Sequence, residues 1–251
     1  MKFLFIVQGE GRGHFTQAIT LEEMLLRNGH EVVEVLVGKS STRTLPGFFN
    51  RSIHAPVKRF ISPNFLPTAD NKRANLTKSF AYNLLRLPEY LRSMYYINQR
   101  IRETGAEVVI NFYELLTGLT YALFRPSVPY ICVGHQYLFL HRDFEFPDKN
   151  SCQLWMLRFF TRMTALRSSK KLALSFLEME QDDMNQIVTV PPLIRQEVTA
   201  IRPEKGDYIH GYMVNSGFAD SVESFHAKHP EVPLTFFWDR SCLLYTSPSP
   251  R

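Results

Sequence analysis

A glycine-rich turn that ends in a histidine is the stretch of this sequence best suited to chemistry. It reads GEGRGH, covers residues 9–14 and follows an apolar run at 2–7. Backbone N–H groups at the start of a helix carry partial positive charge, and glycines let a ligand approach them closely. Histidine has an ordinary pKa near 6.5, so His14 can take a proton from a hydroxyl group at neutral pH. The turn therefore suits an anion or a sugar hydroxyl, unless His14 only caps or packs against the helix start.

Two familiar phosphate-binding motifs do not fit this turn. A dinucleotide site has the spacing G-x-G-x-x-G and an acidic residue about 20 positions further on. Here the spacing is G-x-G-x-G, and the next predicted strand ends Leu36-Val37-Gly38 without an acid. A nucleotide hydrolase loop needs a lysine at its end, and none follows the turn. The residues that would hold a nicotinamide cofactor or ATP are therefore missing.

Strands and helices alternate along most of the chain. Strands are predicted at 2–7, 31–37, 57–61, 107–111, 128–133 and 171–176. Helices are predicted at 15–27, 75–103, 115–124 and 152–167, with Pro88 kinking or dividing the second, and a loop is predicted at 134–150. This order predicts an α/β fold with a Rossmann-like, doubly wound parallel sheet. The glycine turn would then lie at the carboxyl edge of the sheet, where such folds bind ligands.

The same pattern starts again after a proline-rich segment. Residues 188–205 contain Pro191, Pro192 and Pro203 and are interpreted as a linker. A strand at 207–214, a turn at 215–217, a helix at 218–229 and a strand at 234–238 follow. We therefore expect an N-terminal Rossmann-like domain at 1–187 and the start of a second one at 206–240.

The last residues do not continue this pattern. Residues 242–251 read CLLYTSPSPR, which resembles the translation of one frame of a transposon-end adapter used in shotgun DNA sequencing. We expect 241–251 to be a non-native tail, and the natural protein to continue beyond it. The alternative is a strand followed by a Ser/Pro-rich tail.

Composition narrows the class of protein. Hydrophobic residues make up 45% of the 251 residues, which is enough for a large core and argues against intrinsic disorder. No apolar run approaches the roughly 20 residues that span a bilayer, and no signal peptide is apparent, so a cytoplasmic location is expected. The three cysteines, Cys132, Cys152 and Cys242, fit neither a disulfide framework nor a zinc site. No structural metal is expected.

The net charge of +5 is concentrated in two stretches. One covers residues 72–102, and the other covers 158–171, where Trp155, Phe159 and Phe160 are interleaved with or flank the basic residues. Both stretches fit amphipathic helices with solvated basic faces. They also fit a surface that binds anionic lipid headgroups. Nucleic acid is the least favoured partner.

A family resemblance emerges from these features together. The opening strand, the GEGRGH turn, the helix that ends in NGHEV, and the second Rossmann-like start resemble GT-B glycosyltransferases. The pattern is most similar to a family 28-like branch that contains the peptidoglycan lipid-intermediate N-acetylglucosaminyltransferase and the galactolipid synthases. The resemblance covers about 1–240 and is strongest in 1–38.

The resemblance implies a first domain that binds an acceptor and a second that binds a nucleotide-sugar donor such as a UDP-sugar. The reaction would be an inverting, metal-independent transfer to a hydroxyl group, with the nucleotide sugar as co-substrate and no cofactor. A sugar or a lipid-linked molecule would be the acceptor, met at the inner face of an anionic membrane.

The resemblance also assigns roles to residues at matching positions. His14 matches a histidine expected to act as a base or to position the acceptor, and the loop at 134–137 resembles a second acceptor-side loop. The turn at 215–217 matches one that contacts donor phosphates. Hydrogen-bonded loop residues and a simple turn are the alternatives for these two segments. The predicted acceptor contacts are Gly9, Glu10, Gly11, Arg12, Gly13, His135, Gln136 and Tyr137, and the predicted donor-phosphate contacts are Asn215, Ser216 and Gly217.

Two other functions fit the sequence. The family's donor-base and ribose-binding motifs would lie beyond about residue 240, so we expect the 251 residues alone to transfer no sugar. A non-catalytic module that binds a sugar or a lipid head group is one alternative. A GT-B-fold nucleotide-sugar epimerase is another, and it would need an acid in the cleft, for which Glu10 and Glu114 are the candidates.

Overall fold

A computed structural model describes residues 1–39, 45–64, 66, 68, 76–146, 151–213 and 216–237. Backbone contacts divide the chain into two compact units. The first contains Met1–Pro63 and Arg86–Ala200, and the second contains Asn64–Leu85 and Ile201–Arg251. Asn215 and the predicted tail at 241–251 lie outside the described residues.

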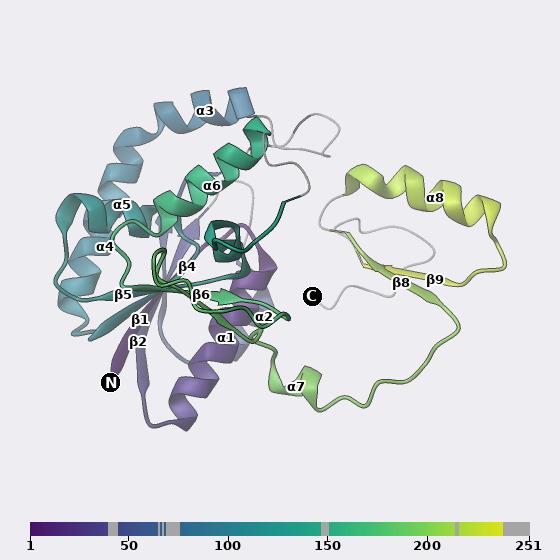
Figure 1. Ribbon diagram of the computed structural model, residues 1–251, viewed down its shortest axis with the longest axis horizontal. Helices are drawn as coiled ribbons and strands as arrows, with labels where there is room; N and C mark the ends of the chain where they lie inside the picture. The colour runs from purple at the N-terminus through teal and green to yellow at the C-terminus, as the bar shows by residue number, and fades with distance from the viewer. Residues whose placement is uncertain are drawn as a thin grey trace. The chain divides into compact units, whose positions relative to one another are not determined.

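The first unit is built on a seven-stranded sheet with the strand order β3-β2-β1-β4-β5-β6-β7 (Figure 1). All six neighbouring pairs are parallel. The chain runs outward from β1 to β3, then returns to β4 and runs outward in the other direction. The predicted α/β, Rossmann-like, doubly wound sheet is thus confirmed. The strands are β1 (Lys2–Val7), β2 (Glu31–Lys39), β3 (Val57–Ile61), β4 (Val108–Phe112), β5 (Tyr130–Val133), β6 (Lys170–Leu174) and β7 (Ile187–Val190).

Helices cover both faces of this sheet (Figure 1). The side chains of β1 alternate between two cores, because successive residues of a strand point to opposite faces. Leu4 and Ile6 belong to the core under α4 (Leu87–Glu103), α5 (Leu115–Phe124) and α6 (Cys152–Thr164). Phe5 and Val7 belong to the core under α1 (Arg12–Arg27) and α2 (Gly47–Ser52). Burial on both faces explains why β1 and β4 are almost uninterrupted apolar runs.

Pro88 divides the long predicted helix at 75–103, as the sequence indicated. The two parts are α3 (Leu76–Leu85), which belongs to the second unit, and α4, which belongs to the first. Pro88 lies in the first turn of α4, where its missing N–H would have no partner within the helix.

Two segments differ from the prediction. The predicted loop at 134–150 begins with a 3₁₀ helix, η1 (His135–Leu140). Residues 188–190, predicted as the start of the linker, belong to β7, which pairs with β6. The strand ends at Pro191 because two successive prolines cannot donate ladder hydrogen bonds. A short helix, α7 (Gln196–Thr199), follows within the predicted linker.

The described part of the second unit contains a strand–helix–strand arrangement. Strands β8 (Ile209–Tyr212) and β9 (Leu234–Phe237) are parallel neighbours. They are connected through η2 (Ser216–Phe218) and α8 (Ala219–Lys228). This is the local structure that the sequence predicted for the start of a second Rossmann-like domain.

Candidate functional site

The candidate site lies at the carboxyl edge of the large sheet. The glycine turn follows β1, Tyr113 and Glu114 follow β4, and Gly134 precedes η1 after β5. Because β4 lies between β1 and β5, these three connections are neighbours. The winding direction reverses between β1 and β4, which is where open α/β sheets bind ligands.

The three glycines of the turn have different structural roles. A Cβ atom on Gly9 would overlap the backbone carbonyl oxygen of Gly38 at the end of β2. A Cβ atom on Gly11 would contact the His14 ring, with Cδ2 at 3.5 Å and Nε2 at 4.0 Å, and one on Gly13 would meet nothing within 4 Å. Packing therefore requires only Gly9. Gly11 and Gly13 leave the backbone open at the start of α1, whose N-cap residue Gly11 offers no side chain to the first N–H groups.

His14 and Gln136 are brought together from turns that are 122 residues apart. His14 lies in the first turn of α1 and is only 5% exposed. Its Nε2 atom is 3.4 Å from the Gln136 side-chain nitrogen in η1. Since an amide nitrogen only donates, this contact fits the neutral imidazole in which Nε2 carries the lone pair.

Burial lowers the pKa of His14 to about 4, and a nearby charge on His135 would lower it further. The Gln17 side chain acts in the opposite direction, but burial dominates. An imidazole with this pKa is uncharged at neutral pH, so its lone pair is available, and it is a weaker base than an ordinary histidine. Arg12, two residues before His14 at the start of α1, has an exposed side chain.

Tyr137, predicted to contact the acceptor, lies in the core instead. Its ring is fully buried and its hydroxyl is 3.0 Å from Thr164 Oγ1. The Thr164 hydroxyl donates to the Thr161 carbonyl oxygen, so Tyr137 donates to Thr164. The 3₁₀ turn of η1 directs residue 137 inward, whereas His135 is exposed and Gln136 is partly buried.

Glu114 is a buried acid at the end of β4. It caps α5, and its Oε1 atom accepts hydrogen bonds from Ser62 Oγ at 2.6 Å and from the Leu116 N–H at 3.1 Å. Burial raises the pKa of Glu114 to about 7, and the charge of Glu10 adds to the rise, against the effect of these hydrogen bonds. Gly38 makes room for the carboxylate, because a Cβ atom there would overlap Glu114 Oε2.

Asn111 fixes the backbone that follows β4. Its side-chain oxygen accepts from the Glu114 N–H at 2.9 Å, and its side-chain nitrogen donates to the Thr164 carbonyl oxygen at 2.9 Å. The start of α5 and the end of α6 are therefore joined through one fully buried amide.

Tyr113 is a site residue that sequence reasoning missed. Its ring lies nearly parallel to the imidazole of His14, with an interplanar angle of 18° and 5.9 Å between centroids. A tyrosine directly after an apolar strand looks like an ordinary core residue. The only available signal was its position at a strand end next to a candidate acid.

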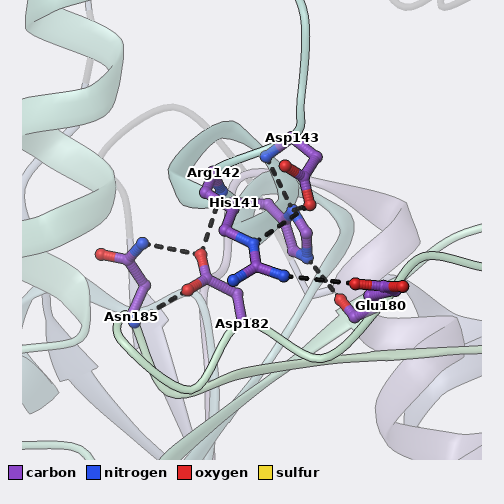
Figure 2. Close-up of polar contacts among 6 residues, drawn as sticks. All are labelled: His141, Arg142, Asp143, Glu180, Asp182 and Asn185. Carbon is purple, nitrogen blue, oxygen red and sulfur yellow. Dashed lines mark hydrogen bonds and ion pairs between the residues drawn. The ribbon is translucent and has the colours of Figure 1, made fainter.

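A polar cluster ties the segment after η1 to the connection between β6 and β7. Asp182, fully buried, accepts from the Arg142 N–H at 3.0 Å and from the Asn185 side-chain nitrogen at 2.7 Å. His141 Nδ1 accepts from the Asp143 N–H, so its Nε2 donates to the Glu180 carbonyl oxygen at 2.9 Å. The buried side chains of His141 and Asp182 bond across the two segments, to Glu180 and Arg142 respectively, so the cluster supports η1. Figure 2 shows its members, His141, Arg142, Asp143, Glu180, Asp182 and Asn185.

The predicted donor-phosphate residues fall in the second unit. Ser216 and Gly217 lie in η2 between β8 and α8, and Asn215 lies outside the described residues. Among the described residues, there is no group of three or more His, Cys, Asp or Glu side chains placed to hold a metal ion. In the same part of the chain, no helix combines the length and apolar character that crossing a membrane requires.

Comparisons with known proteins bear on the whole chain. A family profile described as Glycosyl transferase family 1 matches residues 1–235. No curated protein sequence matches the chain.

Several solved structures share the fold at low sequence identity. Arabidopsis thaliana UGT89C1 complexed with quercetin matches with a TM-score of 0.59 and 14% identity, over 99% of this chain and 70% of that one. Phytolacca americana UGT2, complexed with UDP-2fluoro-glucose and pterostilbene, matches with a TM-score of 0.57 and 12% identity, over 98% and 67%. Streptomyces sp. SF2575 glycosyltransferase SsfS6, complexed with thymidine diphosphate, gives 0.56 and 12%, over 100% and 72%. The chain spans 60% of the length of Acinetobacter baumannii MurG.

Proposed function

Because this chain belongs to glycosyl transferase family 1, we propose that it carries the acceptor side of an inverting, metal-independent sugar transferase with His14 as the general base. The GT-B resemblance seen in the sequence is confirmed for family and fold, although the matched family is described as family 1 and the sequence indicated a family 28-like branch. The observation that carries the proposal is a buried histidine at the start of α1 whose Nε2 atom lies 3.4 Å from the Gln136 side-chain nitrogen and whose ring lies beside the backbone of Gly11.

In the proposed reaction, an acceptor hydroxyl oxygen attacks the anomeric carbon of the donor sugar. The acceptor hydroxyl replaces the Gln136 amide at Nε2 of His14, and Nε2 takes the hydroxyl proton as the new C–O bond forms. The bond between the sugar and the nucleoside diphosphate breaks, and the diphosphate leaves with the electron pair. Attack on the face opposite the leaving group inverts the anomeric centre. General-base assistance of this kind contributes about 10²–10⁴-fold to a rate.

Nucleoside diphosphate sugars are the donor class to test. The similar structures were solved with UDP-2fluoro-glucose, quercetin and thymidine diphosphate, which are ligands of those proteins. In this chain we assign donor-phosphate contacts to Asn215, Ser216 and Gly217. We assign acceptor contacts to Glu10, Arg12, His135 and Gln136, with Gly11 and Gly13 leaving room for the ligand.

The test is transfer of labelled sugar from UDP- and TDP-linked donors to phenolic and lipid-linked acceptors, using the protein from the complete coding sequence. We expect His14→Ala to lower kcat about 10²–10⁴-fold, because the variant loses the Nε2 atom proposed to take the acceptor proton. The control is His30→Gln, which changes a histidine beyond the other end of α1 and should leave kcat unchanged. Wild-type kcat in His14→Ala would overturn the proposal.

The 251 residues alone are proposed to transfer no sugar, because donor-base and ribose-binding motifs are expected only beyond residue 240. Turnover by this chain with any nucleotide sugar would contradict that statement. The epimerase alternative gains no support from Glu114, which is fully buried and caps α5. Release of free sugar from the donor without an acceptor would favour the epimerase. Acceptor binding without any transfer by the complete protein would favour a binding module.

We also propose that the acceptor is lipid-linked and that α6 contacts an anionic membrane surface. Trp155 and Phe159 are 64% and 49% exposed and stack on each other with an interplanar angle of 8°. Arg162, one turn further along, is also exposed. Exposed aromatic side chains beside basic ones are suited to the headgroup region of a bilayer. A peripheral location at the inner face of the membrane would follow.

Sedimentation with vesicles tests this surface. We expect binding to phosphatidylglycerol-containing vesicles at low salt and weaker binding at high salt or to phosphatidylcholine alone. Replacing Trp155 and Phe159 together by serine should abolish binding. Phe176→Ser, at an aromatic residue that is 88% exposed outside α6, is the matched control. Failure of the wild-type chain to bind at either salt concentration would count against the proposal.

A further inference from the structure

Tyr113 has a backbone conformation that bulky residues rarely adopt. Its φ angle is +62°, in the left-handed region, although the side chain is 5% exposed. Such outliers in native structures persist only where surrounding contacts hold them, and they are concentrated at functional sites. Arg125, another described residue with positive φ, has an ordinary explanation because it ends α5. Tyr113 instead connects a central strand to α5 at the candidate site.

The Tyr113 side chain is held at both of its ends. Its hydroxyl lies 2.8 Å from Thr161 Oγ1 on α6. The Thr161 hydroxyl itself donates to the Leu157 carbonyl oxygen at 2.8 Å, so Tyr113 donates and Thr161 accepts. Tyr137 packs edge-on against the Tyr113 ring at 5.7 Å, and Phe160 packs against it at the same distance. The ring therefore has one well-defined position.

That position places the Tyr113 ring along one face of the His14 imidazole. Gln136 contacts the Nε2 edge of the same imidazole, and α1 carries it. We propose that Tyr113 is a positioning residue that fixes the His14 ring and shields it from water, so that Nε2 keeps its place beside Gln136 and the backbone of Gly11. This inference rests on the proposed function, which it extends to a residue that does not itself touch the substrate.

The first test reads His14 directly and needs no substrate. In protein with ¹³C-labelled histidine, the His14 ring signals are followed by NMR as a function of pH. We expect wild type to titrate with a pKa of about 4. Tyr113→Asn removes the ring while keeping a residue that accepts the left-handed region, so the pKa should rise toward 6.5, the ordinary value. Tyr113→Phe keeps the ring and loses only the hydroxyl, so the pKa should stay near the wild-type value.

Tyr113→Gly provides a second variant if Tyr113→Asn does not fold, because glycine adopts the left-handed region without strain and also removes the ring. We expect the same rise in pKa. In the transfer assay, Tyr113→Asn should lower kcat by about 10–100-fold with a smaller change in KM, as expected for a displaced base. Tyr113→Phe should lose less than about fivefold.

The outcomes separate this inference from the proposed function. A folded Tyr113→Asn or Tyr113→Gly variant with an unchanged His14 titration would overturn the positioning role, whatever happens to transfer. A shifted titration in these variants, combined with normal transfer in His14→Ala, would leave the positioning role intact and remove the proposed function.

Discussion

Two buried titratable groups at this sheet edge differ in the direction of their pKa shifts. His14, after β1, has its pKa lowered to about 4, and Glu114, after β4, has its pKa raised to about 7. The main cause is the same, since burial disfavours the charged form of either group. Their neighbours differ, because His14 lies against an aromatic ring and a glutamine, while Glu114 accepts hydrogen bonds from Ser62 and Leu116. Burial thus keeps the His14 imidazole uncharged at neutral pH and leaves the Glu114 carboxyl only partly ionised there.

The two groups should have opposite effects on stability as pH changes. Between pH 4 and 6.5 the unfolded chain binds more protons at His14, so its contribution is complete above pH 6.5 and is lost toward pH 4. Between pH 4.5 and 7 the folded chain binds more protons at Glu114, so its contribution is complete below pH 4.5 and is lost as pH rises through 7. Each shift corresponds to about 3 kcal/mol.

Substituting the glycines should separate packing from ligand access. Gly9→Ala should lower the free energy of unfolding by about 3 kcal/mol or more, because its Cβ would overlap the Gly38 carbonyl oxygen, where backbone cannot easily move. Gly13→Ala should raise it by up to about 1 kcal/mol, because alanine suits a helix and meets nothing there. Urea unfolding of both variants measures the difference. Equal effects at the two positions would remove the distinction.

Replacing Glu114 by glutamine should remove the alkaline loss of stability. Glutamine keeps an oxygen that can accept from Ser62 and Leu116, but it cannot ionise. At pH 8 we expect Glu114→Gln to gain up to about 3 kcal/mol relative to wild type, with little change at pH 4.5. The measurement is the free energy of unfolding across this pH range. A Glu114→Gln variant that loses stability equally at every pH would show that the pKa of Glu114 is not raised in the folded protein.

Replacing His14 by glutamine should instead reduce the loss of unfolding free energy as the pH falls. Wild type is expected to lose about 2 kcal/mol from His14 between pH 6.5 and 4.5, and His14→Gln should lack this loss. The double variant His14→Gln/Glu114→Gln should show neither the acidic nor the alkaline loss of unfolding free energy that these two groups cause. If the unfolding free energy of His14→Gln falls between pH 6.5 and 4.5 as much as that of wild type, His14 is not the group that titrates. The contrast with Glu114 would then be wrong.

Local patterns in the sequence were sufficient to predict the large sheet and part of the candidate site. The apolar runs of β1 and β4, the alternation of strands and helices, and Pro88 each have a short-range signal. The segment HQYLFL, which forms η1, was predicted as part of a loop, because six residues rich in apolar side chains are too few to show a helical period. Strand β7 was missed because the prolines after it suggested a linker.

The features of the site that could not be predicted depend on contacts between residues far apart in the sequence. The glycine turn and His14 form a continuous motif, so they could be found. The inward direction of Tyr137 depends on Thr164, and the role of Tyr113 depends on His14 and Thr161, 48 residues away. Glu114 could be recognised as an acid in the sequence, but the burial that raises its pKa and its hydrogen bond with Ser62, 52 residues earlier, follow only from the fold.

The polar cluster around Asp182 has a consequence for how the protein opens. It joins residues just after η1 to those just before β7, so η1 cannot separate from that edge of the sheet without breaking these partly buried hydrogen bonds. In hydrogen-exchange experiments, the amides of η1 should therefore share the opening free energy of β6 and β7, instead of exchanging as an independent surface turn. Gln136, the partner of His14, would then be carried by a cooperative unit of the fold.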